Sequence, residues 1–82
     1  MDSTTKRLLV QEVFTSKTNL TILAKNGEAA MTVLVTECED MLLRGGTDRE
    51  VALKVITLIL DLALVDERAA ARLQWMKSRY HE

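Results

Sequence analysis

The stretch that decides the fold is residues 48–65, which read DREVALKVITLILDLALV. Beyond Asp48 and Arg49 at its start, its polar side chains recur at i, i+4, i+7 and i+11, a spacing that forms one narrow stripe on a helix with about 3.6 residues per turn. These polar residues are Glu50, Lys54, Thr57 and Asp61. A helix that is apolar over the rest of its surface is buried on nearly every side. We therefore predict a central helix over residues 48–65, with the rest of the chain packed on it.

The composition points to one all-α domain over residues 1–82. The chain has no proline, three glycines and 4% aromatic residues, and its apolar positions follow helical spacing rather than alternation. A chain of 82 residues allows a single domain. We expect a small domain of three to four helices in which the polar residues 1–5 are disordered.

The segments before the central helix supply two of these helices. Apolar residues at i, i+1, i+4 and i+5 from Leu9 predict a short first helix over residues 5–16. Residues 16–27, which read SKTNLTILAKNG, carry turn-forming residues and are predicted to be a connector. A second helix then opens at Asn26 or Gly27 and ends at Arg44, with Gly45 or Gly46 as its left-handed cap. Its apolar stripe is Met31, Leu34, Val35, Cys38, Met41 and Leu42.

Two further boundaries follow from capping chemistry. The run Thr47-Asp48-Arg49-Glu50 fits a capping box, with Thr47 as the N-cap of the central helix. Asp66 can cap a last helix whose inward stripe is Ala69, Leu73, Met76 and Tyr80. Neither glycine nor proline separates that helix from the central one, so the two helices are either continuous or broken near Val65. We favour the break, because a compact domain needs the chain to turn back.

The apolar surface of the central helix predicts a homodimer. The other helices each have one apolar face, and these faces cover less surface than the central helix offers. Leaving a Leu, Ile or Val exposed forfeits about 1.5–3 kcal/mol each. A second copy related by a two-fold axis would cover the remainder. The expected interface is Val55, Leu58, Ile59 and Leu62. The alternative is a compact monomer whose own helices suffice.

Catalytic and metal-binding patterns are absent from the sequence. His81 is the single histidine and lies beside the C-terminus, where it is expected to be mobile. Cys38 lies on an apolar stripe and is expected to be a buried structural thiol. Glu37, Glu39 and Asp40 point in different directions on a helix, which indicates a solvated face rather than a metal site. We predict a protein that is not an enzyme and has no metal, cofactor or small-molecule substrate.

The net charge and the search for targeting signals limit the classes of partner that we expect. The net charge is −1, with basic ends (+2 over residues 1–25, +1 over 65–82) around an acidic middle (−4 over 26–64). This balance does not favour nucleic acid over the whole molecule, although a local patch is compatible with it. The N-terminus lacks a secretory signal, and no apolar run is long enough to cross a bilayer. We therefore expect a cytoplasmic protein without a membrane partner.

One constellation on the last helix is a candidate contact surface. Arg68, Arg72, Trp75 and Arg79 fall at i, i+4, i+7 and i+11 and share a stripe beside the inward face. Arginines around an exposed aromatic either bind a protein as a hot spot or bind nucleic-acid phosphates. In the alternative interpretation, Trp75 packs into the edge of the core and the arginines are merely solvated.

The chain resembles the small enterobacterial YmgB/AriR/YcgZ family of biofilm and acid-resistance regulators. The resemblance runs from about Leu9 to Tyr80. It rests on the hydrophobic pattern and on the residues at helix ends. The matching positions are Phe14 with Asn19-Leu20, the amphipathic run 31–43, Arg44-Gly45-Gly46, Lys54-Val55-Ile56 through Leu58 and Leu60, and Asp66 with Arg72-Leu73. It implies a helical homodimer, similar in shape to the Hha-type nucleoid modulators. It also implies a connector to the Rcs phosphorelay that acts through the response regulator, with some members binding DNA.

The sequence therefore leaves three functions in competition. The first is a connector that binds a response regulator or another transcription factor. The second is a nucleoid-type transcription modulator that binds DNA directly through its basic ends. The third is an inhibitor or antitoxin-like binding module carried by a mobile element. Salt dependence separates the first two, because phosphate contacts release counterions.

Overall fold

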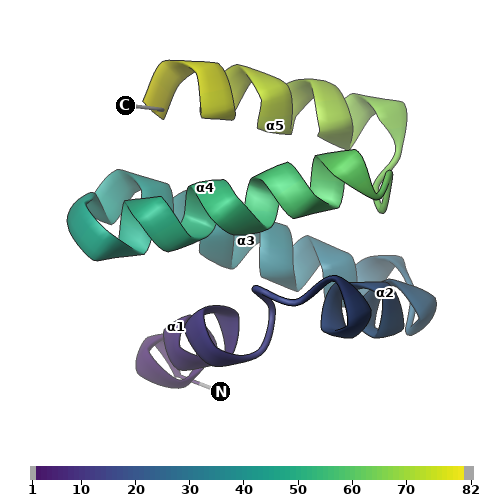
Figure 1. The fold of residues 1–82 in the computed structure, drawn as a ribbon, viewed down its shortest axis with the longest axis horizontal. Helices are drawn as coiled ribbons and strands as arrows, with labels where there is room; N and C mark the ends of the chain where they lie inside the picture. Colours follow the sequence, from purple (N-terminus) through teal and green to yellow (C-terminus); the bar gives the residue numbers. More distant parts are fainter. Residues whose placement is uncertain (1, 81–82) are drawn as a thin grey trace.

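The computed structural model describes residues 2–80, which form five helices and no strand (Figure 1). The helices are α1 (Ser3–Glu12), α2 (Lys17–Lys25), α3 (Glu28–Arg44), α4 (Gly46–Asp61) and α5 (Glu67–Tyr80). The all-α class is confirmed, with one helix more than the three to four expected.

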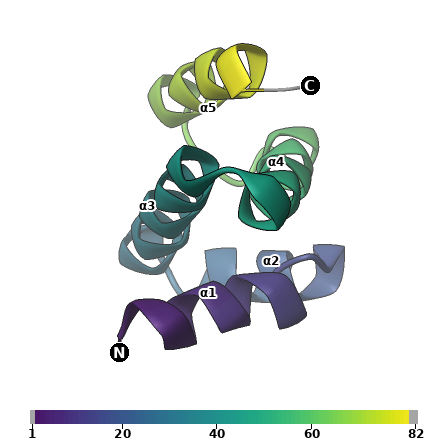
Figure 2. The same cartoon turned by 90° about the vertical axis from the view of Figure 1, so that its left-hand side faces the viewer.

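The helix α4 is the element on which the others are arranged. It packs most extensively on α3 and also contacts α1 and α5. Figure 2 shows α5 on one side of the α3–α4 pair, and α1 and α2 lying across the opposite side. The polar stripe faces outward, with Glu50, Lys54 and Asp61 exposed, whereas Val55 and Ile56 are fully buried. The periodicity of this segment thus predicted its central position correctly.

The first helix begins earlier and ends sooner than its apolar pattern indicated. It starts at Ser3, inside the segment expected to be disordered, and ends at Glu12 rather than at Ser16. Asp2 is its N-cap and accepts a hydrogen bond of 2.8 Å from the Thr5 backbone N–H, which also lowers the pKa of Asp2. Met1 lies outside the described residues.

The predicted connector is wrong, because most of it forms α2. Ser16 is the N-cap and accepts a hydrogen bond of 3.4 Å from the Asn19 backbone N–H. The Asn19 side chain donates to the carbonyl of Val13 at 3.0 Å, which ties the helix start to the preceding turn. Leu20 is fully buried, so burial of this leucine supports a helix in a segment whose polar residues favour turns.

The turn between α3 and α4 is a single residue, Gly45. Its φ of +77° and ψ of −169° lie in a region that is essentially restricted to glycine, and Gly46 has a φ of +58°. The predicted end of α3 at Arg44 is confirmed. The predicted N-cap is wrong: Thr47 lies inside α4, the N-cap position is Gly45, and no side chain caps this end. Two consecutive glycines let the helix begin before Thr47.

The turn between α4 and α5 is built without glycine. The helix ends at Asp61, four residues before the predicted end, and Ala63 adopts a left-handed φ of +52°. The Leu64 N–H donates to the Ile59 carbonyl at 3.1 Å and the Ala63 N–H donates to the Leu60 carbonyl at 3.2 Å. These two hydrogen bonds form a Schellman motif, in which Ala63 occupies the position that usually holds glycine.

The last helix begins where capping chemistry placed it. The carboxylate of Asp66 accepts a hydrogen bond of 2.9 Å from the Ala69 backbone N–H. The break between the last two helices is therefore confirmed, although it falls earlier than Val65. Leu73 and Met76 are buried and Ala69 and Tyr80 are half-buried, which confirms the predicted inward stripe.

One chain buries part of the apolar surface of the central helix. The radius of gyration is 11.5 Å, and a compact domain of this length has about 12 Å. Val55 and Ile59 are fully buried within the chain, while Leu58 and Leu62 are half-buried. Two of the four residues expected at a dimer interface are thus covered by the chain's own helices, and only Leu58 and Leu62 retain surface that a second copy can contact.

Candidate functional site

The exposed flank of α5 carries the stripe predicted from the sequence. Arg68, Arg72 and Arg79 are exposed. Trp75 is 61% exposed to solvent. The alternative in which Trp75 packs into the edge of the core does not agree with this exposure. Helical spacing places the four residues on one flank of α5. This flank faces solvent because the neighbouring face, which carries Leu73 and Met76, packs on the core.

Arg79 holds the aromatic end of the stripe in place. Its guanidinium carbon lies 5.5 Å from the centroid of the Trp75 ring and 5.8 Å from that of the Tyr80 ring. On α4, Arg49 lies 5.2 Å from the Tyr80 centroid. Each distance is within the range of a cation–π contact. These contacts link Trp75 through Arg79 and Tyr80 to α4, so the exposed indole is supported rather than isolated.

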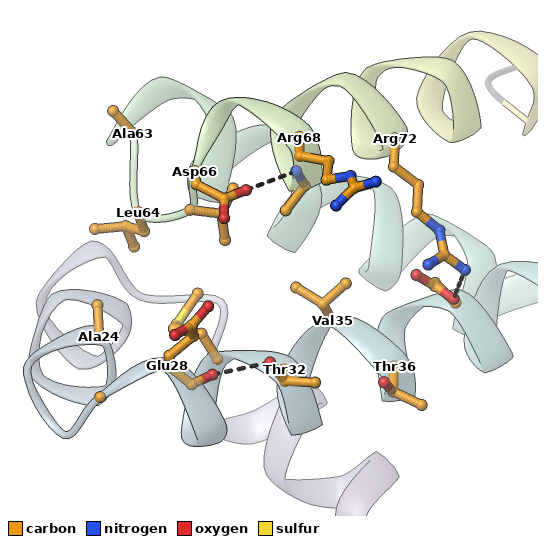
Figure 3. A pocket seen from close by; sticks show the side chains of 15 residues that line it. Ala24, Glu28, Thr32, Val35, Thr36, Ala63, Leu64, Asp66, Arg68 and Arg72 are labelled. Atoms are coloured by element: carbon orange, nitrogen blue, oxygen red, sulfur yellow. Dashed lines mark hydrogen bonds and ion pairs between the residues drawn. The ribbon is translucent and has the colours of Figure 1, made fainter.

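The other two arginines differ in their engagement. Arg72 forms an ion pair of 3.0 Å with Glu39, which joins α5 to α3 (Figure 3). The Arg68 side chain forms no ion pair or hydrogen bond with the other residues in the range 2–80. Arg68 and Arg79 are therefore the cations of the stripe that are free of a carboxylate partner within residues 2–80, while Arg72 is already partly neutralised.

A groove lies beside the stripe, and the sequence did not indicate it. It has a volume of about 940 Å³ and is bounded by the first part of α3, the Ala63–Asp66 loop and the first part of α5. Figure 3 shows Val35, Leu64 and Arg68 around this space, with the Arg72–Glu39 ion pair at one end. Of the six residues on the predicted apolar stripe of α3, Val35 is the one that is only half-buried, and it lines this groove.

A polar cluster on the other side of the molecule anchors α1. The Asp48 carboxylate accepts a hydrogen bond of 3.0 Å from the Gln11 side chain and lies 3.9 Å from Arg7. Arg44 lies 3.8 Å from Asp48 and 3.4 Å from Glu37. Glu37 is only 5% exposed, so the predicted solvated acidic face is wrong at this position. The partner that permits this burial is Arg44, two turns further along the same face of α3.

Candidate reactive groups give no site within the described residues. Cys38 is fully buried, and burial together with the charges of Glu37 and Glu39 raises the pKa of its thiol to about 12. This agrees with the predicted structural thiol. Among residues 2–80, no group of three or more His, Cys, Asp and Glu side chains is arranged to hold a metal ion. His81, expected to be mobile, lies outside the described residues.

The fold and site define a class: an all-α domain with an arginine–tryptophan surface on its last helix and an adjacent groove. No helix in the described range 2–80 is both long and apolar enough to cross a membrane. Comparison with protein-family models, with curated proteins and with solved structures gave no match. The resemblance to the YmgB/AriR/YcgZ family therefore stays a prediction from the sequence pattern.

Proposed function

We propose that this chain is a non-enzymatic regulatory protein that acts by binding another protein through the exposed flank of α5. The observation that carries the proposal is Trp75, which is 61% exposed in the middle of a helix and contacts Arg79. Exposing an indole is costly in water, whereas tryptophan and arginine are the residues most enriched in interface hot spots. The contact with Arg79 also reduces the side-chain entropy lost when a partner covers the ring.

The nature of the partner follows from charge and from the sequence resemblance. The arginine stripe begins next to Asp66 and Glu67, and Arg72 is paired with Glu39, so carboxylates surround its first half. A phosphate backbone would meet these carboxylates, whereas a protein surface can match both signs. The resemblance names a response regulator or another transcription factor as the partner, in biofilm and acid-stress gene expression.

Direct DNA binding is the second candidate. It is favoured by one observation: Arg68, Arg72 and Arg79 all lie on one exposed flank of one helix. A homodimer, which the resemblance also implies, would present two such flanks. Leu58 and Leu62 are the expected interface residues that retain accessible surface for this contact.

One titration series separates the two candidates, because Trp75 is the only tryptophan in the chain. Its fluorescence emission is recorded while purified response regulators, and separately a labelled duplex DNA, are added. A protein partner that covers the indole shifts the emission to shorter wavelength. DNA binding, followed by anisotropy, would instead weaken steeply between about 50 and 200 mM salt.

The variant Trp75→Ala tests the surface itself. We expect it to weaken binding of the protein partner about 30-fold, the effect of losing a hot spot worth about 2 kcal/mol. Circular dichroism provides the control, because an exposed side chain contributes little to the fold. Unchanged affinity for the partner in Trp75→Ala would contradict the proposal, and salt-sensitive DNA binding by the wild type would favour the second candidate.

A further inference from the structure

The groove beside the arginine stripe arises from the way the last helices pack. Both α3 and α5 pack on α4, but they make few contacts with each other, so a trough remains between them. At one end the Ala63–Asp66 loop lies opposite Ala24, near the end of α2, and the ion pair between Arg72 and Glu39 crosses the other end (Figure 3). The space of about 940 Å³ therefore has two helical walls and is open to solvent.

The two walls of the groove carry opposite charges. The α3 wall presents the carboxylates of Glu28 and Glu39, while the α5 wall presents the guanidinium groups of Arg68 and Arg72. Because Glu39 and Arg72 pair with each other at 3.0 Å, Glu28 and Arg68 are the wall charges without an ion pair within residues 2–80. Between the walls lie the apolar side chains of Met31, Val35, Leu64, Val65 and Ala69. The remaining carboxylate, that of Asp66, already accepts the hydrogen bond from Ala69. Away from that ion pair, a section across the groove thus meets the carboxylate of Glu28, the apolar floor and the guanidinium of Arg68 in that order.

We propose that this groove binds an amphipathic helix of a partner protein. The apolar ridge of that helix lies on the groove floor, its basic residues face the α3 wall and its acidic residues face the α5 wall. This inference rests on the proposed function and specifies how the partner is held. It places the helix beside Trp75, because Arg68 and Arg72 belong both to the groove wall and to the stripe that contains Trp75.

The walls explain why the bound segment is a helix. Both walls are α-helices whose backbone groups are bonded within each helix, so they offer no free edge to an extended peptide. A helix satisfies its own backbone and needs only side-chain contacts. From Glu28 to Glu39 the α3 wall is twelve residues long and spans about 16 Å, which matches about three turns of a bound helix.

The test uses three synthetic helical peptides of about 15 residues with the same leucine ridge and no tryptophan. The first carries glutamates along one flank of the ridge and lysines along the other, the second only glutamates and the third only lysines. Binding to the full chain is measured by anisotropy of a fluorescent label, and the site is located from the methyl NMR signals of Val35, Leu64 and Val65. We expect the mixed-charge peptide to bind at least about tenfold more tightly than the other two and to shift these signals.

Two variants with the same change of charge, from a cation to a glutamate, test whether the α5 wall contacts the peptide. Arg68→Glu reverses the free cation of the α5 wall and should weaken the mixed-charge peptide about tenfold, while a glutamate suits the first turn of α5. Lys77→Glu, on the same helix but away from the groove, should leave the affinity unchanged. Equal weakening by both variants, or equal binding of all three peptides, would overturn the inference.

Other outcomes separate this inference from the proposed function. Methyl signals that shift with protein concentration alone would show that a second copy occupies the groove, which overturns the inference. Failure of the peptides, combined with a response regulator that shifts the Trp75 emission, would overturn the groove alone. Peptides that bind the groove, combined with a partner whose affinity is unchanged by Trp75→Ala, would support the groove and overturn the proposed role of Trp75.

Discussion

The two turns that flank α4 reverse the chain by different means. The turn before α4 is one glycine, Gly45, in a backbone conformation that other residues avoid. The turn after it places Ala63 in the left-handed region and closes with two backbone hydrogen bonds. The first turn therefore follows from the residue type, because glycine permits its backbone conformation. The second turn depends on tertiary packing, which holds an alanine in an unfavourable conformation. The difference predicts how each turn responds to substitution.

The largest effect is expected at the glycine turn. Gly45→Ala should destabilise the fold by about 2 kcal/mol, because φ of +77° with ψ of −169° is strained for any residue with a Cβ. The nearest atom to the added Cβ is at 3.6 Å, so the cost is conformational rather than steric. Urea unfolding measures it. A loss below about 0.5 kcal/mol would show that the turn relaxes and that the contrast with Ala63 is overstated.

The helix starts that follow the two turns should differ in their sensitivity to loss of a polar side chain, because a side chain caps α5 but not α4. Asp66→Ala should cost about 1 kcal/mol, because it removes the acceptor of the Ala69 N–H at 2.9 Å. Thr47→Ala is the matched control, since Thr47 is exposed and caps no helix end, and it should change stability by less than about 0.5 kcal/mol. Thermal melts of both variants test this. A larger loss for Thr47→Ala than for Asp66→Ala would restore the capping box predicted from the sequence.

The smallest effect is a gain at the alanine turn. Ala63→Gly should stabilise the protein by about 0.5 kcal/mol, because relief of the left-handed strain exceeds the extra chain entropy of glycine. The same substitution at the exposed Ala71, within α5, should destabilise it by about 1 kcal/mol. Opposite signs for one chemical change are the expected result of urea titrations. Destabilisation at both positions would mean that Ala63 is not strained.

The contrast between the turns also explains which parts of the fold the sequence predicted. The apolar stripes of α3, α4 and α5 extend over enough residues to define a period, and those helices were found. The end of α4 was not, because its left-handed residue is an alanine and therefore leaves no signature. The helix α2 was missed for a related reason: it has nine residues, and burial of Leu20 outweighs the turn preferences of its neighbours.

The candidate site was predictable only where it lies on one helix. The stripe of Arg68, Arg72, Trp75 and Arg79 follows from helical spacing, and its exposure agrees with that spacing. The groove combines residues from α3, the loop after α4 and α5, so its existence depends on packing between segments distant in sequence. Helical spacing likewise puts Glu37 and Arg44 on one face of α3, but the burial of Glu37 depends on the other helices that pack on α3.

The buried thiol of Cys38 is a built-in probe of local opening of the core. With no exposed surface and a pKa of about 12, this thiol is hidden and protonated in the folded state. A disulfide reagent therefore reacts only during the moments when α3 separates from its neighbours. When reclosing is faster than labelling, the reaction rate is proportional to the fraction of molecules whose core is open under native conditions. A reagent with a coloured leaving group would report that fraction in a spectrophotometer, without denaturant.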